Sequence, residues 1–246
     1  MRLAVLSDVH GNSAALDAVL IDLDRRQVDR VINLGDCLSG PLDASGTVKR
    51  LMALGWPTVC GNHDRQLYDR PKSEMGPWEA WVIDSLSKDE LDWVKSFPKT
   101  ISEGSTLFCH ATPKSDEENW LDFRGPQHRL IARDLPGVTS RLGDTSANLI
   151  CCGHTHTPRV VKIPGGPMIV NSGAVGVPAY LDTRMEPNFV HQTGAPFARY
   201  AIIEIVDGEW RADLVNVPYD PSDMIKLAEA KGAIHWARAL ASGWIA

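Results

Sequence analysis

The sequence predicts an α/β fold with two β-sheets in one domain. Three observations support this prediction. The first 60 residues alternate strand, helix, strand, helix and strand, which is typical of consecutive right-handed βαβ units and a parallel sheet. After residue 152 the β signals become shorter and hairpin-like, which predicts a second, mainly antiparallel group. Finally, a hydrophobic content of 43% and a charged content of 23% lie in the ordinary range of soluble globular proteins.

The first half of the chain contains clear start and stop signals. Asn12 or Ser13 is a suitable N-cap for a helix whose apolar residues recur at helical spacing and which ends at the basic pair Arg25-Arg26. Gly55 is suited to close a second helix as its C-cap. In order, we expect strand 3–6, a helix ending near residue 26, strand 30–34, helix 45–54 and strand 57–60.

The rest of the chain combines further helical segments with short strands. Residues 66–100 look helical and peripheral, with Ser87 and Glu90 as a capping box and Pro98 as a stop. Residues 113–147 are irregular, with a short helix expected near 127–133, and form a candidate lid over the site. Apolar runs predict strands at 106–109, 149–152, 159–163, 168–170, 200–206 and 210–215, and helices at 223–230 and 233–241. Without a repeat or low-complexity tract, we expect residues 1–246 to form a single domain.

Charge and cysteine content restrict the class of protein. A formal net charge of −6 gives no basic footprint, so we expect no stable nucleic-acid binding and no polybasic membrane anchor. No apolar run approaches the length of a membrane span, and the N-terminal run lacks the features of a signal peptide. The five cysteines include no CxxC pair, which favours buried thiols in a reducing compartment. We therefore expect a cytoplasmic protein, of unknown oligomeric state, with no membrane partner.

Five apolar runs each end in side chains that bind metals. In the most informative, Val59-Cys60 leads through a glycine into Asn62, His63 and Asp64. If the runs are neighbouring strands, their ends converge on one site. Together the runs supply seven potential ligands: Asp8, His10, Asp36, Asn62, His110, His154 and His156.

Seven ligands are too many for one tetrahedral zinc ion and suit two ions that share a bridge. Carboxylate, amide and imidazole groups together favour Mn, Fe, Zn, Co or Ni. Asp36 is the carboxylate best placed to bridge the two ions. Four positive charges from two divalent ions, less three from Asp8, Asp36 and a bridging hydroxide, leave one positive charge. The expected guest is therefore a small anion, and a metal-bound hydroxide is the expected nucleophile.

The order of these motifs, D-x-H, G-D, G-N-H-D, H and G-H-x-H, resembles that of the calcineurin-like metallophosphoesterase superfamily. The turn Asn171-Ser172-Gly173-Ala174 also resembles a loop of its small prokaryotic members. The resemblance implies a four-layer αββα sandwich of two mixed sheets and a dinuclear metal centre. It assigns Asp8, His10, Asp36 and His156 to one ion, and Asp36, Asn62, His110 and His154 to the other. It also implies that His63 is a catalytic proton donor or charge stabiliser, oriented by Asp64.

The resemblance implies a phosphoric ester hydrolase (EC 3.1) that attacks a phosphodiester or a nucleotide-like phosphate with the bridging hydroxide, with Mn²⁺ as the ion expected to support activity. A protein phosphatase is an alternative, but Asp36 is followed by Cys37-Leu38-Ser39-Gly40 instead of the Asp-Arg-Gly that carries the phosphate-gripping arginine in Ser/Thr phosphatases. A scaffold that has lost catalysis is a second alternative, although this chain retains every expected ligand. The natural substrate and native metal stay open.

Four further residues are candidate substrate contacts, and three of them also have an ordinary structural interpretation. Asn12 is either a phosphate contact or a helix cap. Arg65 is either a phosphate contact or a solvated arginine. Trp120 lies in the candidate lid, where it is suited to form an aromatic wall. His128 either touches substrate there or is an ordinary surface or core residue.

Overall fold

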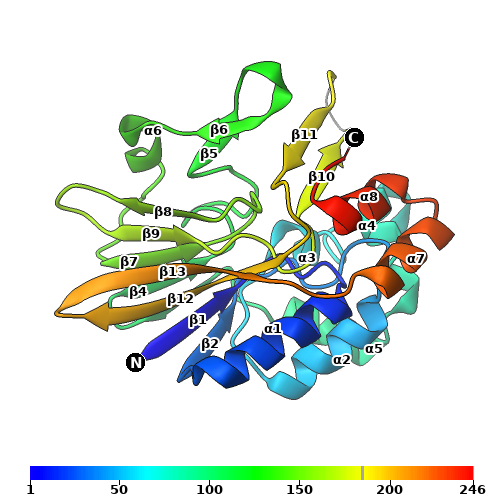
Figure 1. Cartoon of the computed structure of the whole chain (residues 1–246), viewed down its shortest axis with the longest axis horizontal. Coiled ribbons are helices and arrows are strands. Elements are labelled where there is room, and N and C mark those ends of the chain that lie inside the picture. The colour runs from blue at the N-terminus through cyan, green and yellow to red at the C-terminus, as the bar shows by residue number, and fades with distance from the viewer. Residues whose placement is uncertain (184–185, 246) are drawn as a thin grey trace.

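Two β-sheets, each built from distant parts of the chain, form the centre of the molecule (Figure 1). The computed structural model describes residues 1–183 and 186–245. Within these ranges the first sheet has the order β13-β12-β1-β2, in which β1 and β2 are parallel and the other pairs antiparallel. Its strands are β1 (Arg2–Leu6), β2 (Arg30–Asn33), β12 (Ala198–Val206) and β13 (Glu209–Val217).

The second sheet has the order β3-β4-β7-β9-β8. Its three central strands are parallel and its two outer strands antiparallel to their neighbours, so this sheet is also mixed. Its strands are β3 (Thr100–Glu103), β4 (Thr106–Cys109), β7 (Leu149–Cys152), β8 (Arg159–Lys162) and β9 (Met168–Asn171).

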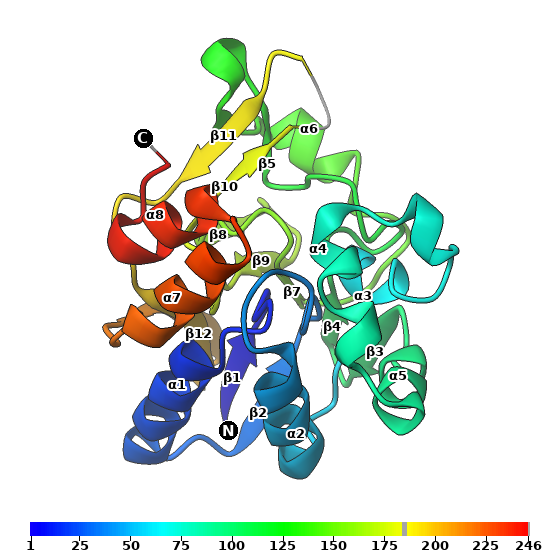
Figure 2. The ribbon, with the colours of Figure 1, turned by 90° about the vertical axis from the view of Figure 1, so that its right-hand side faces the viewer.

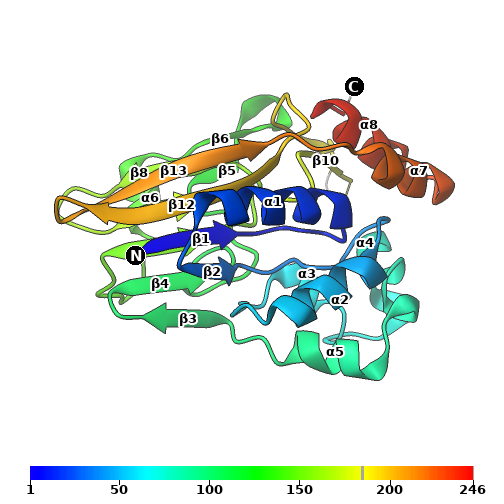
Figure 3. The same ribbon diagram turned by 60° about the horizontal axis from the view of Figure 1, so that its bottom comes forward.

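Alternation along the strands creates the layers. In β1, Leu3 and Val5 lie in the core between the two sheets, whereas Ala4 and Leu6 face the helices outside. The helices on that outer face are α1 (Ser13–Arg26) and α2 (Ala44–Leu54), with α5 (Lys88–Lys95) beside them (Figure 3).

The opposite outer face of the second sheet is covered by a thinner layer, in which Trp120, Leu121 and Val138 pack on the sheet. Val138 comes from the short helix α6 (Leu135–Thr139). The expected αββα sandwich is therefore confirmed, although much of this fourth layer is irregular chain. Residues 113–147, which were expected as a lid, therefore contribute in part to the core.

Helix ends follow the expected capping signals. The Asn12 side chain accepts a hydrogen bond from the Ala15 amide at 3.0 Å, and Asp43 caps α2 through the Gly46 amide at 2.8 Å. Gly55 closes α2 in the left-handed conformation, with φ at +60°. The Ser87 and Glu90 capping box is present at the start of α5.

The later strands do not form one antiparallel group as predicted: β12 and β13 join β1 in the first sheet, whereas β8 and β9 join β7 in the second. Two predicted elements also differ in the structure. The strand expected at 57–60 is reduced to one bridge between Asn33 and Thr58. The helix expected at 127–133 is wrong: this region holds a hairpin of β5 (Asp122–Arg124) and β6 (Leu130–Ala132), joined by the 3₁₀ turn η3 (Pro126–His128). The sequence Gly125-Pro126 favours a turn, and pairing with β5 then selects extended chain.

Another hairpin, β10 (Ala179–Asp182) and β11 (Phe189–Gln192), was not predicted. Figure 1 shows it projecting beyond the two main sheets on the same side as β5 and β6. The Arg124 guanidinium links the hairpins, because it pairs with Asp182 at 2.6 Å and lies 4.7 Å from the centre of the Phe189 ring.

The remaining helices surround the carboxyl ends of β1 and β2. Figure 2 shows α7 and α8 on one side of this region and α3 and α4 on the other. They comprise α3 (Asn62–Arg65), η1 (Lys72–Glu74), α4 (Pro77–Ala80), η2 (Ile83–Ser85), α7 (Ser222–Ala230) and α8 (Ile234–Ser242). Across residues 1–183 and 186–245, none of the helices combines the length and apolar character needed to cross a membrane.

Candidate metal centre

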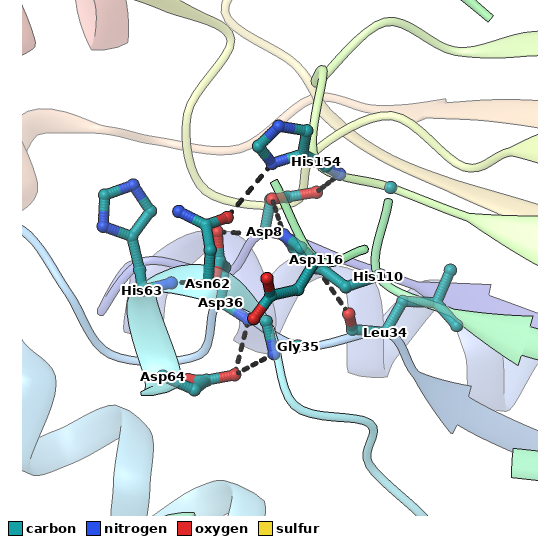
Figure 4. A network of polar contacts seen from close by, with 12 residues as sticks. Asp8, Leu34, Gly35, Asp36, Asn62, His63, Asp64, His110, Asp116 and His154 are labelled. Carbon is teal, nitrogen blue, oxygen red and sulfur yellow. Dashed lines mark hydrogen bonds and ion pairs between the residues drawn. The ribbon is translucent and has the colours of Figure 1, made fainter. Parts of the chain in front are cut away.

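The seven ligand candidates meet where strands of both sheets end. Asp8 and His10 follow β1, Asp36 follows β2, and Asn62 begins α3. From the second sheet, His110 follows β4, while His154 and His156 follow β7. Figure 4 shows several of these side chains pointing toward one another from separate segments. Because strands β1 and β2, and likewise β4 and β7, run parallel, their carboxyl ends share one edge.

The ligands form two groups. In the first, Asp8 Oδ1 lies 3.2 Å from His156 Nε2 and 3.9 Å from His10 Nε2. In the second, Asp36 Oδ2 lies 3.2 Å from His110 Nε2, and His154 completes the group. These are the residues that the resemblance assigns to the two separate ions.

Asp36 and Asn62 complete this arrangement. Asp36 Oδ2 is also 3.9 Å from His10 Nε2 of the first group, so this one oxygen borders both groups. Asn62 Oδ1 lies 3.1 Å from His154 Nδ1 and thus belongs beside the second group. The positions suit Asp36 as a carboxylate shared by two cations.

The polar atoms of the site fit metal ions. Three histidines donate Nδ1–H away from the centre: His10 contacts Ser39 Oγ at 2.9 Å, His110 the Leu34 carbonyl at 2.7 Å, and His156 the Val177 carbonyl at 2.9 Å. Their Nε2 atoms are thereby oriented toward the carboxylates, as in metal sites. Within the described chain, Asp8 Oδ1, His10 Nε2 and His110 Nε2 are buried without a hydrogen-bond partner. Such orphaned atoms are costly unless a cation binds them.

The protonation states of most candidate ligands also suit the binding of metal ions. Burial lowers the pKa of His10 to about 3 and that of His154 to about 4, so both imidazoles are neutral at pH 7. Although burial raises the pKa of Asp8, His156 and His110 outweigh it and lower the pKa to about 2. For His110, burial lowers the pKa, but Asp36 raises it to about 10 overall. Neutral imidazole and ionised carboxylate are the states that bind metals.

Five ligands adopt the left-handed backbone conformation, which is unfavourable for residues other than glycine. Their φ values lie between +48° and +66°, and they are Asp8, His10, Asp36, His154 and His156. Strained backbone that persists in a packed structure is concentrated at functional sites. The backbone therefore gives evidence for the same site independently of its side chains.

Two glycines lie so close to neighbouring side chains of the site that no larger residue would fit in their place. A Cβ atom on Gly61 would lie 2.1 Å from Asp36 Oδ1, and one on Gly153 would lie 1.9 Å from Ser7 Oγ. Each distance is far inside van der Waals contact. Glycine is therefore required where the chain passes against Asp36 and against the residue preceding Asp8.

Asp64 and His63 do not form the expected contact in the described structure, and each has another partner. Figure 4 shows the two side chains on opposite sides of α3. The Asp64 carboxylate accepts hydrogen bonds from the backbone amides of Asp36, Cys37 and Gly61 at 2.7, 2.9 and 3.1 Å. Asp64 thus holds the turn after β2 in place. His63 Nδ1 pairs instead with Glu79, a residue that the sequence motifs did not single out.

A cleft of about 350 Å³ opens beside the ligands. Its lining includes Asp36, Asn62, His63, His154 and His156. Arginine, aromatic and acidic side chains from other segments extend the lining away from the ligands: Arg70, Trp78, Glu79, Arg124, Tyr180 and Asp182. The cleft is therefore the place where an anion can reach the ligand groups.

The four candidate substrate contacts do not line this cleft. Asn12 is buried, caps α1 and donates to the Gly176 carbonyl at 2.9 Å, so the helix-cap interpretation holds. Trp120 is a core residue whose Nε1–H donates to the Val138 carbonyl at 3.0 Å. His128 is exposed at the turn between β5 and β6. Arg65 pairs with Asp116 and Glu117 and lines a separate, smaller cavity.

Residues 1–205 match the profile of the family described as the calcineurin-like phosphoesterase superfamily domain. The chain belongs to this superfamily. Metal dependence is a property of the superfamily, and membership indicates a phosphoesterase hydrolase. The two ligand groups lie wholly within the matched residues.

Relatives of this calcineurin-like chain support the same family and fold. A metallophosphoesterase from Sphaerobacter thermophilus is 25% identical, with a TM-score of 0.75 and 99% of each chain covered. A hypothetical protein from Pyrococcus horikoshii shares the fold with a TM-score of 0.74 at 12% identity, over 98% of each chain. An uncharacterized protein from Methanocaldococcus jannaschii is 26% identical over 229 residues, which cover 89% of this chain and 88% of that protein.

Proposed function

We propose that this protein is a dinuclear metal-dependent phosphoesterase that hydrolyses a small phosphodiester or a nucleotide-like phosphoric ester. The observation that supports it most is the pair of ligand groups beside the cleft, with orphaned, buried polar atoms in both. Asp8, His10, Asp36 and His156 would hold one ion. Asp36, Asn62, His110 and His154 would hold the other.

When bound, two divalent cations neutralise phosphoryl oxygens and make water acidic enough to attack at neutral pH. The chain contributes the remaining steps. Asn62 contacts His154 and so helps to keep the second ligand group in place. The cleft admits the ester next to the two ligand groups. His63, beside the ligand Asn62, donates a proton to the departing oxygen, a contribution of about 10²- to 10⁴-fold for a positioned acid. The leaving group departs as an alcohol, and no covalent bond to the protein forms.

The cleft favours this substrate class over a phosphoprotein. Residues 37–40, where Ser/Thr phosphatases of the superfamily have their arginine, are buried here, and Ser39 is used to hold His10. The arginines that line the cleft, Arg70 and Arg124, come from other segments. A volume of about 350 Å³ suits a nucleotide-sized molecule and lies within the range of small-molecule sites.

The test is turnover of a bis-aryl phosphodiester and of an aryl monophosphate with Mn²⁺, with and without a chelator, beside direct measurement of bound metal. We expect two ions per chain, preferential turnover of the diester, and loss of activity with chelator. Two bound ions without turnover of either ester would favour the scaffold instead. Turnover of a phosphopeptide faster than the diester would favour the protein phosphatase.

Two finer proposals concern the metal and the compartment. We propose Mn²⁺ as the activating ion, because mixed oxygen and imidazole ligands suit it; activity measured with Mn, Fe, Zn, Co and Ni ions tests this. We propose a reducing, cytoplasmic location because the described cysteines are all buried and free. Fractionation of cells tests the location. A screen of nucleotides, dinucleoside polyphosphates and cyclic dinucleotides would identify the natural substrate.

A further inference from the structure

We propose that Glu79 is a positioning residue that fixes the ring of His63 for proton transfer, an inference that rests on the proposed function. His63 Nδ1–H donates a hydrogen bond to Glu79 Oε1. The two residues come from different helices, α3 and α4. Both line the cleft beside the ligand groups. The contact therefore belongs to the site rather than to a distant surface.

The burial of Glu79 argues for a specific role. Its side chain is only 3% exposed, and a buried carboxylate is unfavourable unless a donor or cation compensates it. His63 is the ionisable partner in contact with it in the described structure. A carboxylate that serves only packing would be replaced at less cost by an apolar residue.

The surroundings of the pair also fix the His63 ring. Trp78, the residue before Glu79, stacks on the His63 ring with centroids 4.9 Å apart and planes at 16°. Its carbonyl accepts a hydrogen bond from the Gly40 amide at 2.9 Å, which ties α4 to the loop after β2. α4 thus supplies a stacking surface and a hydrogen-bond acceptor to one imidazole. The ring is held against both rotation and tilt.

This geometry assigns the proton positions. Because Nδ1 keeps its proton on Glu79, Nε2 is the nitrogen that can give a proton to substrate. In the reaction the Nε2 proton passes to the departing oxygen, the bond from phosphorus to that oxygen breaks, and His63 becomes neutral with Nδ1–H still bound to Glu79. The adjacent carboxylate keeps the ring in the one orientation and tautomer that this step requires.

The experiment compares Glu79→Ala, Glu79→Gln, His63→Ala and the double variant on two substrates, a diester with a good aryl leaving group and one with a poor alkyl leaving group. We expect Glu79→Ala to lower kcat on the poor leaving group by about 10²-fold, as for loss of general acid catalysis, with KM nearly unchanged. The good leaving group should be little affected. Glu79→Gln keeps an oxygen acceptor for Nδ1–H and should restore part of the rate.

The double variant separates positioning from a general structural role. If Glu79 acts through His63, its removal adds nothing once His63 is alanine, so the double variant should match His63→Ala. A matched control is Glu90→Ala, which removes the Glu90 half of the capping box of α5 and should lower stability without changing either rate. Equal losses on both substrates, or additive losses in the double variant, would overturn the proposal.

A second readout needs no turnover. In metal-free protein labelled at histidine nitrogen, we expect the His63 Nδ1–H proton signal to be shifted downfield by its carboxylate partner and to disappear in Glu79→Ala. If the signal is present but the wild type hydrolyses neither ester, the proposed function fails while the pairing stands. If the wild type is active and the signal is unchanged in Glu79→Ala, the positioning role is disproved.

Discussion

Asp36 is the carboxylate that we propose to be shared by the two ligand groups. Its Oδ2 lies 3.2 Å from His110 Nε2 and 3.9 Å from His10 Nε2, while Oδ1 accepts the His63 amide at 2.8 Å. We expect Asp36→Asn, which keeps the shape but removes the charge, to reduce the binding of both ions together. Metal analysis after dialysis should show fewer than two ions per chain, with a matching loss of turnover.

The control for this change is Asp213→Asn at an exposed position of β13. It should keep both ions and full activity. Full dinuclear occupancy in Asp36→Asn would refute the bridging role.

The lowered pKa of Asp22 makes the stability of the folded protein depend on pH in acid. Partial burial raises its pKa, but hydrogen bonds from Tyr200 and Arg26, at 2.6 and 2.7 Å, outweigh burial and lower the pKa below its usual value. Because the folded state binds this proton less readily than the unfolded chain, the stabilisation is complete above the unfolded pKa of about 3.9 and is lost as pH falls through the lower folded pKa.

We therefore expect Asp22→Asn to be less stable than the wild type at pH 7 and to approach it below about pH 4, the unfolded range for aspartate. Urea unfolding between pH 7 and pH 3 measures this. A constant difference in unfolding free energy across the range would show that Asp22 does not carry this pH dependence.

At the scale of the elements, the turn into α3 requires Gly61 to lie close against Asp36. We expect Gly61→Ala to push the Asp36 carboxylate out of place, since the new methyl group would lie 2.1 Å from Oδ1. Metal binding and turnover should fall together. The control is Gly208→Ala, where φ is +85° but nothing lies within 4 Å.

The control variant should lose about 1 kcal/mol from its backbone conformation and keep its metals. Retention of both ions in Gly61→Ala would mean that the loop shifts without disturbing Asp36.

Helix α8 lies beyond the residues that match the family, yet it reaches the site. Trp236 is buried and packs edge-on against Trp78, with ring centroids 4.6 Å apart. We expect Trp236→Ala to cost about 3 kcal/mol of stability, as for a buried large-to-small change, and to slow turnover of poor leaving groups. Denaturant unfolding and the two-substrate assay measure these effects.

Trp244→Ala, which removes a half-exposed tryptophan from the same end of the chain, is the matched control and should affect neither quantity strongly. If Trp236→Ala keeps the wild-type selectivity between leaving groups, α8 has no influence on the chemical step.

Elements with strong local signals were predictable from the sequence. Alternation and caps placed β1, α1, α2 and α5 correctly because local preference and tertiary packing agree there. The hairpin of β5 and β6 was missed because short, polar strands carry little periodicity, and pairing with a partner decides their conformation.

The convergence of the candidate ligands could also be predicted from the sequence, since glycine and histidine follow apolar runs in recognisable order. Glu79 could not be predicted in this way. It lies 16 residues from His63 along an irregular segment, and their contact exists only after α4 packs against α3.

At the scale of the whole molecule, the core between the sheets joins both halves of the chain. Leu3, Val5 and Ile203 of the first sheet pack with Phe108 and Val170 of the second. We propose that the chain is one domain and expect it to unfold in a single cooperative transition. Far-ultraviolet circular dichroism and tryptophan fluorescence should give coincident curves. Two separated transitions would divide the chain into independent units.

The left-handed backbone at five ligand positions restricts how this centre can be redesigned. Valine, isoleucine and threonine are strongly disfavoured at such positions, whereas glycine, asparagine and aspartate are tolerated. A library that randomises those ligands would therefore recover a narrow set of side chains, whatever metal is selected for. Retuning the centre for another ion is better attempted at the outer contacts, such as Ser39 beside His10, where the backbone sets no such filter.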